Sequence, residues 1–164
     1  MEKLRFKNFN DTYQIKTLNQ LVIRGGSGGT PKSTNKDYYN GEISFLSISD
    51  ITNSNGYIYE TAKHINELGL KNSSAWIVPK EAISLAMYAS VGKVAILKKS
   101  LATSQAFYNM VFSNLITRDY IYQYLKKMEQ TGRWNRLVST GTQANLNAQK
   151  IKNLKIKLPL DLAE

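Results

Sequence analysis

Several residue types are scarce in this chain of 164 residues, and each scarcity excludes a class of site. There is no cysteine, which excludes a disulfide framework and a thiolate metal site. His64 is the single histidine, which argues against most zinc sites and most histidine-based acid–base catalysis. We interpret it as a surface or capping residue.

Long apolar runs are also missing. No stretch approaches the roughly 20 apolar residues that cross a membrane, and the opening residues MEKLRFKNFNDTYQ lack the apolar region of a secretory signal. Hydrophobic residues make up 42% of the chain, which is enough to bury the core of one domain. We therefore expect a soluble, cytoplasmic protein.

Acidic residues are few, and most of them lie in the first half. The chain has 22 basic and 12 acidic residues, a net charge of +10. Residues 1–82 hold 10 basic and 8 acidic residues (10 − 8 = +2), and residues 83–164 hold 12 and 4 (12 − 4 = +8). A basic excess concentrated in one part of a domain favours a polyanionic partner, and above all nucleic acid.

The stretch IRGGSGGTPKST, residues 23–34, has the outline of a nucleotide-binding P-loop but not its spacing. Five residues after Gly26, where the motif needs a second glycine, the chain has Pro31. Proline has no N–H to offer a phosphate, and no helical pattern follows. Two readings remain: a mobile surface loop, or a loop whose Lys32 and Lys36 approach a phosphate backbone.

The apolar pattern predicts strands and helices in one domain. We expect strands ending at residue 23 and over 43–48, 75–78, 82–88, 93–97, 106–112 and 154–158, with a polar loop over 25–41. A helix capped by Thr117 is predicted from the apolar stripe Ile121, Tyr124, Leu125 and Met128, and Gly132 ends it. Shorter helices are expected over 61–70 and 146–154. This mixture predicts an α+β fold with mixed or antiparallel β-sheet.

Four stretches, in order along the chain, resemble those of one protein family. They are KLRFKNF with YQIKTLNQL, GGTPKSTNKDYYNGEISFLSISDI, GLKNSSAWIVPKEAISLAMYASVGKVAI and STGTQANLNAQKIKNLKIKLP. The chain is similar to a target-recognition domain of the DNA specificity (S) subunit of type I restriction-modification enzymes. Tyr13 stands where that family more often has tryptophan.

The resemblance implies a binding role without a catalytic centre. In this family an S subunit has two recognition domains joined by long helices, and each domain reads one half of a split DNA target. Modification subunits bind S-adenosylmethionine, and restriction subunits use ATP and magnesium, so we expect no cofactor in this chain. The residues agree, because the three prolines are isolated and the Asp/Asn-Pro-Pro-aromatic motif of adenine methyltransferases is missing.

The chain stops at Glu164, where the long helix of the family would begin. Residues 1–160 are therefore expected to form one recognition domain, without the long helix or the second domain. Two functions are weighed. The first is sequence-specific binding of double-stranded DNA at half of a bipartite target. The alternative is a truncated fragment that acts mainly as a protein-interaction module docking on modification subunits.

The side chains that contact DNA are mainly Arg, Lys, Asn, Gln, Ser and Thr. The DNA-binding candidates are therefore Lys32, Ser33, Thr34, Lys36, Lys93, Lys98, Lys99, Arg133, Arg136, Thr142 and Gln143. The lysines are candidates for phosphate contacts, with a solvated surface as the alternative. Gln143 belongs to the family signature, and a role in holding the fold stays open. Trp134 is interpreted as a core anchor in preference to a DNA contact.

Two further groups of charged residues have plain interpretations. Asp37, Glu42 and Asp50 form the densest acidic group, but they lie among turn residues and are interpreted as hydrated carboxylates in place of a metal site. The alternating lysines near the end form a solvated face or lie against a partner subunit: Lys150, Lys152, Lys155 and Lys157.

Overall fold

A five-stranded sheet with fully buried central strands forms the centre of the molecule. The structure, a computed structural model, describes residues 12–138 and 145–159. The strand order is β2-β9-β6-β7-β4. In that order the strands comprise Arg24–Ser27, Phe107–Val111, Ile83–Ala86, Val94–Leu97 and Tyr57–Ile58. Every residue of β6 and β7 is buried, which explains why β7 is a continuous apolar run and why Ser84, the polar residue of β6, is hydrogen-bonded.

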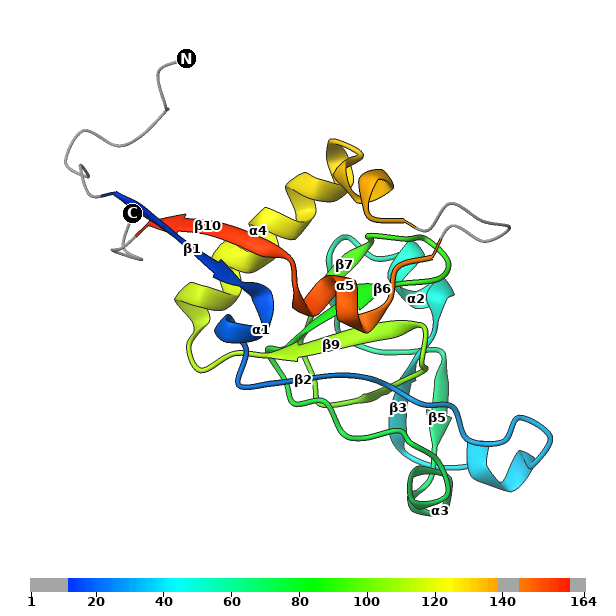
Figure 1. The fold of residues 1–164 in the computed structure, drawn as a ribbon. Coiled ribbons are helices and arrows are strands. Elements are labelled where there is room, and N and C mark those ends of the chain that lie inside the picture. Colours follow the sequence, from blue (N-terminus) through cyan, green and yellow to red (C-terminus); the bar gives the residue numbers. More distant parts are fainter. Residues whose placement is uncertain (1–11, 139–144, 160–164) are drawn as a thin grey trace.

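The long helix α4 (Leu115–Gln130) packs on this sheet (Figure 1). Ile121, Leu125 and Met128 of the predicted stripe are buried in one cluster with apolar side chains of β6 and β7, each contributing about 1.5–3 kcal/mol. The predicted cap at Thr117 is wrong, because Asn114 precedes the helix and its Oδ1 accepts a hydrogen bond from the Thr117 N–H at 2.8 Å. Gly132 follows the helix in the left-handed conformation.

A second sheet of three strands extends the molecule away from α4 (Figure 1). Its order is β5-β3-β8, and the strands comprise Lys63–Ile65, Ile43–Leu46 and Ala102–Thr103. Strand β3 is antiparallel to β5 and parallel to β8. Helices η1 (Lys36–Tyr39) and α3 (Glu67–Lys71) lie at the end of this sheet, and α2 (Ile48–Thr52) follows β3.

The helix predicted over 61–70 is wrong in its first half. Residues 63–65 form β5, which pairs with β3. Helix α3 begins only after Asn66, whose side chain accepts a hydrogen bond from the Gly69 N–H at 2.8 Å. Pairing with β3 therefore overrides the local helical pattern.

The glycine-rich stretch begins as a strand, contrary to the predicted loop over 25–41. Arg24–Ser27 form β2, which pairs antiparallel with β9. Leu21 belongs to α1 (Leu18–Leu21), and Val22 and Ile23 lie between that helix and β2, so the strand expected to end at residue 23 is also wrong. The strand expected over 75–78 reduces to a single bridge between Val78 and Leu101.

The first and last strands lie side by side. Strand β1 (Tyr13–Thr17) pairs antiparallel with β10 (Lys155–Pro159), so that Tyr13 is opposite Pro159. Helix α5 (Ala148–Lys152) leads into β10 and contributes the buried Ile151 to the core around α4. The sheets and the five α-helices among the described residues confirm the expected α+β fold.

A buried polar network connects the two larger sheets. The Ser84 hydroxyl of β6 donates to Asn109 Oδ1 of β9 at 2.6 Å, and Asn109 Nδ2 donates to Thr103 Oγ1 of β8 at 2.8 Å. All three residues are fully buried. Because buried polar groups are costly without partners, the network fixes β8 relative to the five-stranded sheet.

Candidate nucleic-acid interface

The glycine loop, residues 28–35, is fixed to the sheets at its start. The Gly28 N–H donates to the Phe107 carbonyl at 3.3 Å, and the Gly29 N–H donates to the Thr103 carbonyl at 3.0 Å. Both glycines are buried, and a Cβ on Gly28 would collide with the Thr103 carbonyl. The loop therefore needs glycine for close packing on β8 and β9. These N–H groups are already bonded, so the mobile-loop reading does not hold for Gly28 and Gly29.

Further contacts shape the rest of the loop. The Tyr39 hydroxyl donates to the Pro31 carbonyl at 2.6 Å, and burial raises the pKa of this phenol. The Asn35 side chain caps η1 by accepting from the Asp37 N–H at 3.2 Å. The loop thus projects the exposed candidates Lys32, Ser33 and Thr34 from a packed base, and the exposed Lys36 follows at the start of η1.

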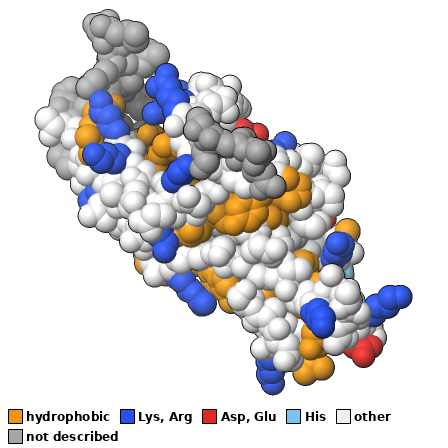
Figure 2. Space-filling view, turned by 45° about the vertical axis from the view of Figure 1, so that its right-hand side comes forward, with side chains coloured by type: hydrophobic (Ala, Val, Ile, Leu, Met, Phe, Trp, Pro, Cys, Tyr) orange, Lys and Arg blue, Asp and Glu red, His pale blue; other side chains and the backbone are white. Residues whose placement is uncertain are grey.

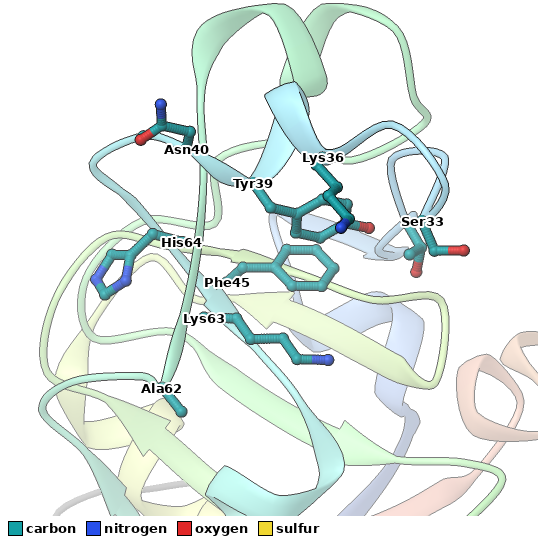
Figure 3. Close-up of a pocket in the computed structure, with 10 residues that line it drawn as sticks. Ser33, Lys36, Tyr39, Asn40, Phe45, Ala62, Lys63 and His64 are labelled. Carbon is teal, nitrogen blue, oxygen red and sulfur yellow. The ribbon is translucent and has the colours of Figure 1, made fainter.

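A pocket of about 620 Å³ lies between the glycine loop, η1 and β5. This lysine pocket is lined by residues that include Ser33, Lys36, Tyr39, Phe45, Lys63 and His64. Tyr39 and Phe45 pack edge to face with ring centroids 6.4 Å apart. Figure 3 shows the Phe45 ring between the Lys36 and Lys63 side chains. The pocket therefore combines an aromatic wall with two ammonium groups.

Lys63 was not among the DNA-binding candidates predicted from the sequence. It reaches the pocket because β5 pairs antiparallel with β3, which places Lys63 opposite Phe45. Within the described ranges neither Lys36 nor Lys63 forms an ion pair with a carboxylate. The charge of the pocket is therefore available to an anion. Lys63 could have been recognised as a candidate if residues 63–65 had been predicted as a strand.

The candidates Lys98 and Lys99 lie elsewhere and are paired with carboxylates. Lys98 Nζ is 3.1 Å from Glu81 Oε1, and Lys99 Nζ is 3.0 Å from Glu60 Oε2. The pKa of Glu60 is lowered to about 2, first by the hydrogen bond from the Thr61 N–H and then by those from Lys99 and Ser44. A phosphate would have to compete with these carboxylates for both lysines.

The Glu81 carboxylate also holds a buried arginine. Arg118 of α4 is 7% exposed and donates through Nη1 to Glu81, and its hydrogen bond is the main reason that the pKa of Glu81 is lowered. Through this pair, Lys98 belongs to a contact between α4 and the turn before β6. That is a structural role.

The remaining candidates lie away from the lysine pocket. Lys93 is half-buried just before β7, and its N–H donates to the Ser90 carbonyl at 2.9 Å. Arg133 and Arg136 are exposed on η2 (Arg133–Arg136), and Trp134 between them is only 3% exposed, which confirms it as a core anchor. Thr142 and Gln143 lie outside the described residues.

Basic side chains are spread along one face of the molecule. Figure 2 shows Lys and Arg at both ends of the elongated molecule and along its edge, with Asp and Glu at few places. Such a face attracts polyanions over a distance that the ionic strength sets through screening.

Of the three acidic residues in the densest acidic group, Asp50 has local hydrogen-bond partners. Asp50 accepts hydrogen bonds from the Ser47 N–H at 2.9 Å and the Ala62 N–H at 3.1 Å. Over residues 12–138 and 145–159, no group of three or more His, Asp or Glu is placed to hold a metal ion. In the same ranges, no helix is long and apolar enough to cross a membrane.

The chain matches one protein family over most of its length. The model of the type I restriction modification DNA specificity domain matches residues 10–164. The chain is 32% identical over 151 residues to the type I restriction enzyme MjaIX specificity subunit of Methanocaldococcus jannaschii, covering 91% of this chain and 34% of the relative. It is 27% identical over 146 residues to the HindI specificity subunit of Haemophilus influenzae, covering 88% and 31%. The chain thus spans about a third of these relatives.

Solved structures share the fold. The S subunit of a type I restriction-modification system from M. genitalium superposes with a TM-score of 0.62 at 15% identity, over 95% of this chain and 36% of that one. The HsdS subunit from Thermoanaerobacter tengcongensis gives 0.62 at 13% identity, over 90% and 33%. At this identity the likeness establishes the architecture alone.

Proposed function

Because this chain belongs to the type I restriction modification DNA specificity domain family, we propose that it binds double-stranded DNA as a non-catalytic target-recognition domain. Residues 1–160 form that domain, and it reads one half of a bipartite target. Both curated relatives are named specificity subunits. Modification and restriction subunits are the proposed partners, and they would supply the binding of S-adenosylmethionine, ATP and magnesium.

One observation supports this function most directly: the lysine pocket carries two ammonium groups without carboxylate partners in the described residues. Lys36 comes from η1 and Lys63 from β5, so the two charges are held on separate elements around one opening. Lysines placed in this way neutralise backbone phosphates, which positions a protein on a duplex without reading its sequence.

The base-reading part of the proposal rests on the glycine loop. Lys32, Ser33 and Thr34 are exposed on a loop whose base is bonded to β8 and β9. A loop with a fixed base holds hydroxyl and ammonium groups at defined positions, as hydrogen bonding to base edges in the major groove requires. Ser33 also lines the lysine pocket, which places a hydroxyl beside the proposed phosphate contacts.

A salt titration tests the phosphate contacts. The change is the double variant Lys36→Ala/Lys63→Ala, and the readout is fluorescence anisotropy of a labelled duplex at several salt concentrations. Each lost phosphate contact lowers the slope of log affinity against log salt by about 0.9, so the variant should lose about 1.8. The loss should be the same on all duplex sequences, because phosphates carry no sequence information.

The matched control is Lys16→Ala/Lys80→Ala, which removes the same charge from two exposed lysines outside the pocket. If both double variants lower the slope equally, the lysine pocket has no special part in binding. If the unmodified chain binds duplex DNA no better at low salt than an uncharged protein, the proposed function itself is refuted.

A further inference from the structure

A groove of about 610 Å³ lies between α4 and the paired strands β1 and β10, away from the lysine pocket (Figure 1). We call it the tyrosine groove, and its lining includes Tyr13, Tyr120, Tyr124, Lys127, Arg133 and Lys157. The Tyr120 hydroxyl donates to the Lys157 carbonyl at 2.6 Å, and the Tyr124 hydroxyl donates to the Lys155 carbonyl at 3.4 Å. These bonds attach α4 to β10 and leave the tyrosine rings as walls.

The groove is basic, and its cations lie against aromatic rings. Lys157 Nζ is 4.6 Å from the centroid of the Tyr13 ring, and Arg133 Cζ is 5.7 Å from that of Tyr124. Lys127 is exposed on α4. No aspartate or glutamate among the described residues lines the groove. An anionic ligand is therefore the chemical complement of this surface.

The walls are too apolar for a ligand that offers phosphates alone. Ile15 lies on the same face of β1 as Tyr13, opposite Lys157, and is 68% exposed. A DNA duplex keeps its base faces stacked inside and presents mainly phosphates and sugars, which leave an isoleucine and tyrosine rings with little to pack against. A protein segment carries carboxylates and apolar side chains together. Aromatic and arginine side chains are also the residues enriched at protein interfaces.

We propose that the tyrosine groove binds an acidic segment of another protein chain, one in which aspartate or glutamate alternates with apolar side chains. Lys127 and Arg133 pair with the carboxylates, and Ile15 with the tyrosine rings receives the apolar side chains. Arg133, a DNA-binding candidate from its sequence context, is assigned here to the groove. The inference is independent of DNA binding at the lysine pocket.

The test titrates the full chain into a labelled 12-residue peptide of alternating glutamate and leucine. Binding is measured by the fluorescence anisotropy of the peptide. The variant Lys127→Glu/Arg133→Glu replaces two exposed cations with repulsive charges and should weaken binding about tenfold, since single exposed ion pairs contribute little each. The control Lys80→Glu/Lys152→Glu makes the same charge change outside the groove and should bind like the unmodified chain. Circular dichroism and thermal unfolding serve as controls that each variant is folded.

A companion peptide with glutamine in place of glutamate should not bind. Failure of the glutamate peptide to bind, or equal weakening by both double variants, overturns the proposal. A parallel titration with a duplex separates it from DNA binding: if the groove variant loses more duplex affinity than the control while peptide binding is unchanged, the groove belongs to nucleic acid. Self-association that the groove variant abolishes would assign it to a second copy of the chain, which also overturns the proposal.

Discussion

Asn109 is the residue whose removal should reveal how the two larger sheets are held together. Its side chain accepts one hydrogen bond from Ser84 and donates another to Thr103, at 2.6 and 2.8 Å, with no exposed surface on any of the three residues. Removing one partner of a buried hydrogen bond, so that the other partner is left unpaired, costs about 1–3 kcal/mol in total. We therefore expect Asn109→Ala to lower the free energy of unfolding by about 3–4 kcal/mol.

The test is a double-mutant cycle that combines Asn109→Ala with Ser84→Ala. The free energy of unfolding of each variant is measured by urea unfolding. Alone, Ser84→Ala should cost about 1–2 kcal/mol, because it removes one hydrogen bond from Asn109. In the Asn109→Ala background the Ser84 hydroxyl has already lost its partner, so removing it should cost nothing. The expected coupling energy is about 1–2 kcal/mol. If the costs of the two substitutions simply add, the network is not a unit and the reasoning is refuted.

Three further outcomes are expected. Gly28→Ala should lower both stability and duplex affinity, because its Cβ would collide with the Thr103 carbonyl beneath the glycine loop; unchanged anisotropy and unfolding curves would contradict this. Trp134→Ala should cost about 3–5 kcal/mol in urea unfolding because the side chain is buried. Glu60→Gln concerns a carboxyl whose pKa is lowered from 4.5 to about 2. Its contribution to stability is present above pH 4.5 and is lost as the pH falls through about 2, so the loss of stability on acidification in urea unfolding should be smaller in the variant. The same change releases Lys99 and should strengthen duplex binding at neutral pH, and weaker binding would count against Lys99 as a phosphate contact.

The parts of the fold that the sequence predicted well have strong internal patterns. Helix α4 shows a stripe of apolar residues over several turns, and β6, β7 and β9 are mainly apolar segments in which Ser84 and Asn109 are the polar residues. Strand β2 has no such signal, since two of its four residues are glycines without side chains. It is a strand only because β9 lies beside it. Strand β5 is similar, because pairing with β3 decides its conformation.

The candidate site was predictable only where its residues are neighbours in sequence. Lys32, Ser33, Thr34 and Lys36 follow a recognisable loop motif and lie together in the structure. Lys63 joins them through pairing between strands, which composition does not reveal. Conversely, Lys98 looks like a free basic residue in the sequence, but the antiparallel pairing of β6 with β7 brings it beside Glu81. Partners distant in sequence thus decide which lysines carry available charge.

The pairing of β1 with β10 has a consequence for how such a unit can be exchanged. Tyr13 lies directly opposite Pro159, so the chain enters and leaves the domain at neighbouring points, about 5 Å apart for facing residues in a sheet. A unit with adjacent ends can be inserted into a longer polypeptide, or replaced by a homologue of different loop sequence, without changing the distance between the flanking segments. The paired strands β1 and β10 thus keep the spacing of the flanking segments constant while the loops between them differ in sequence.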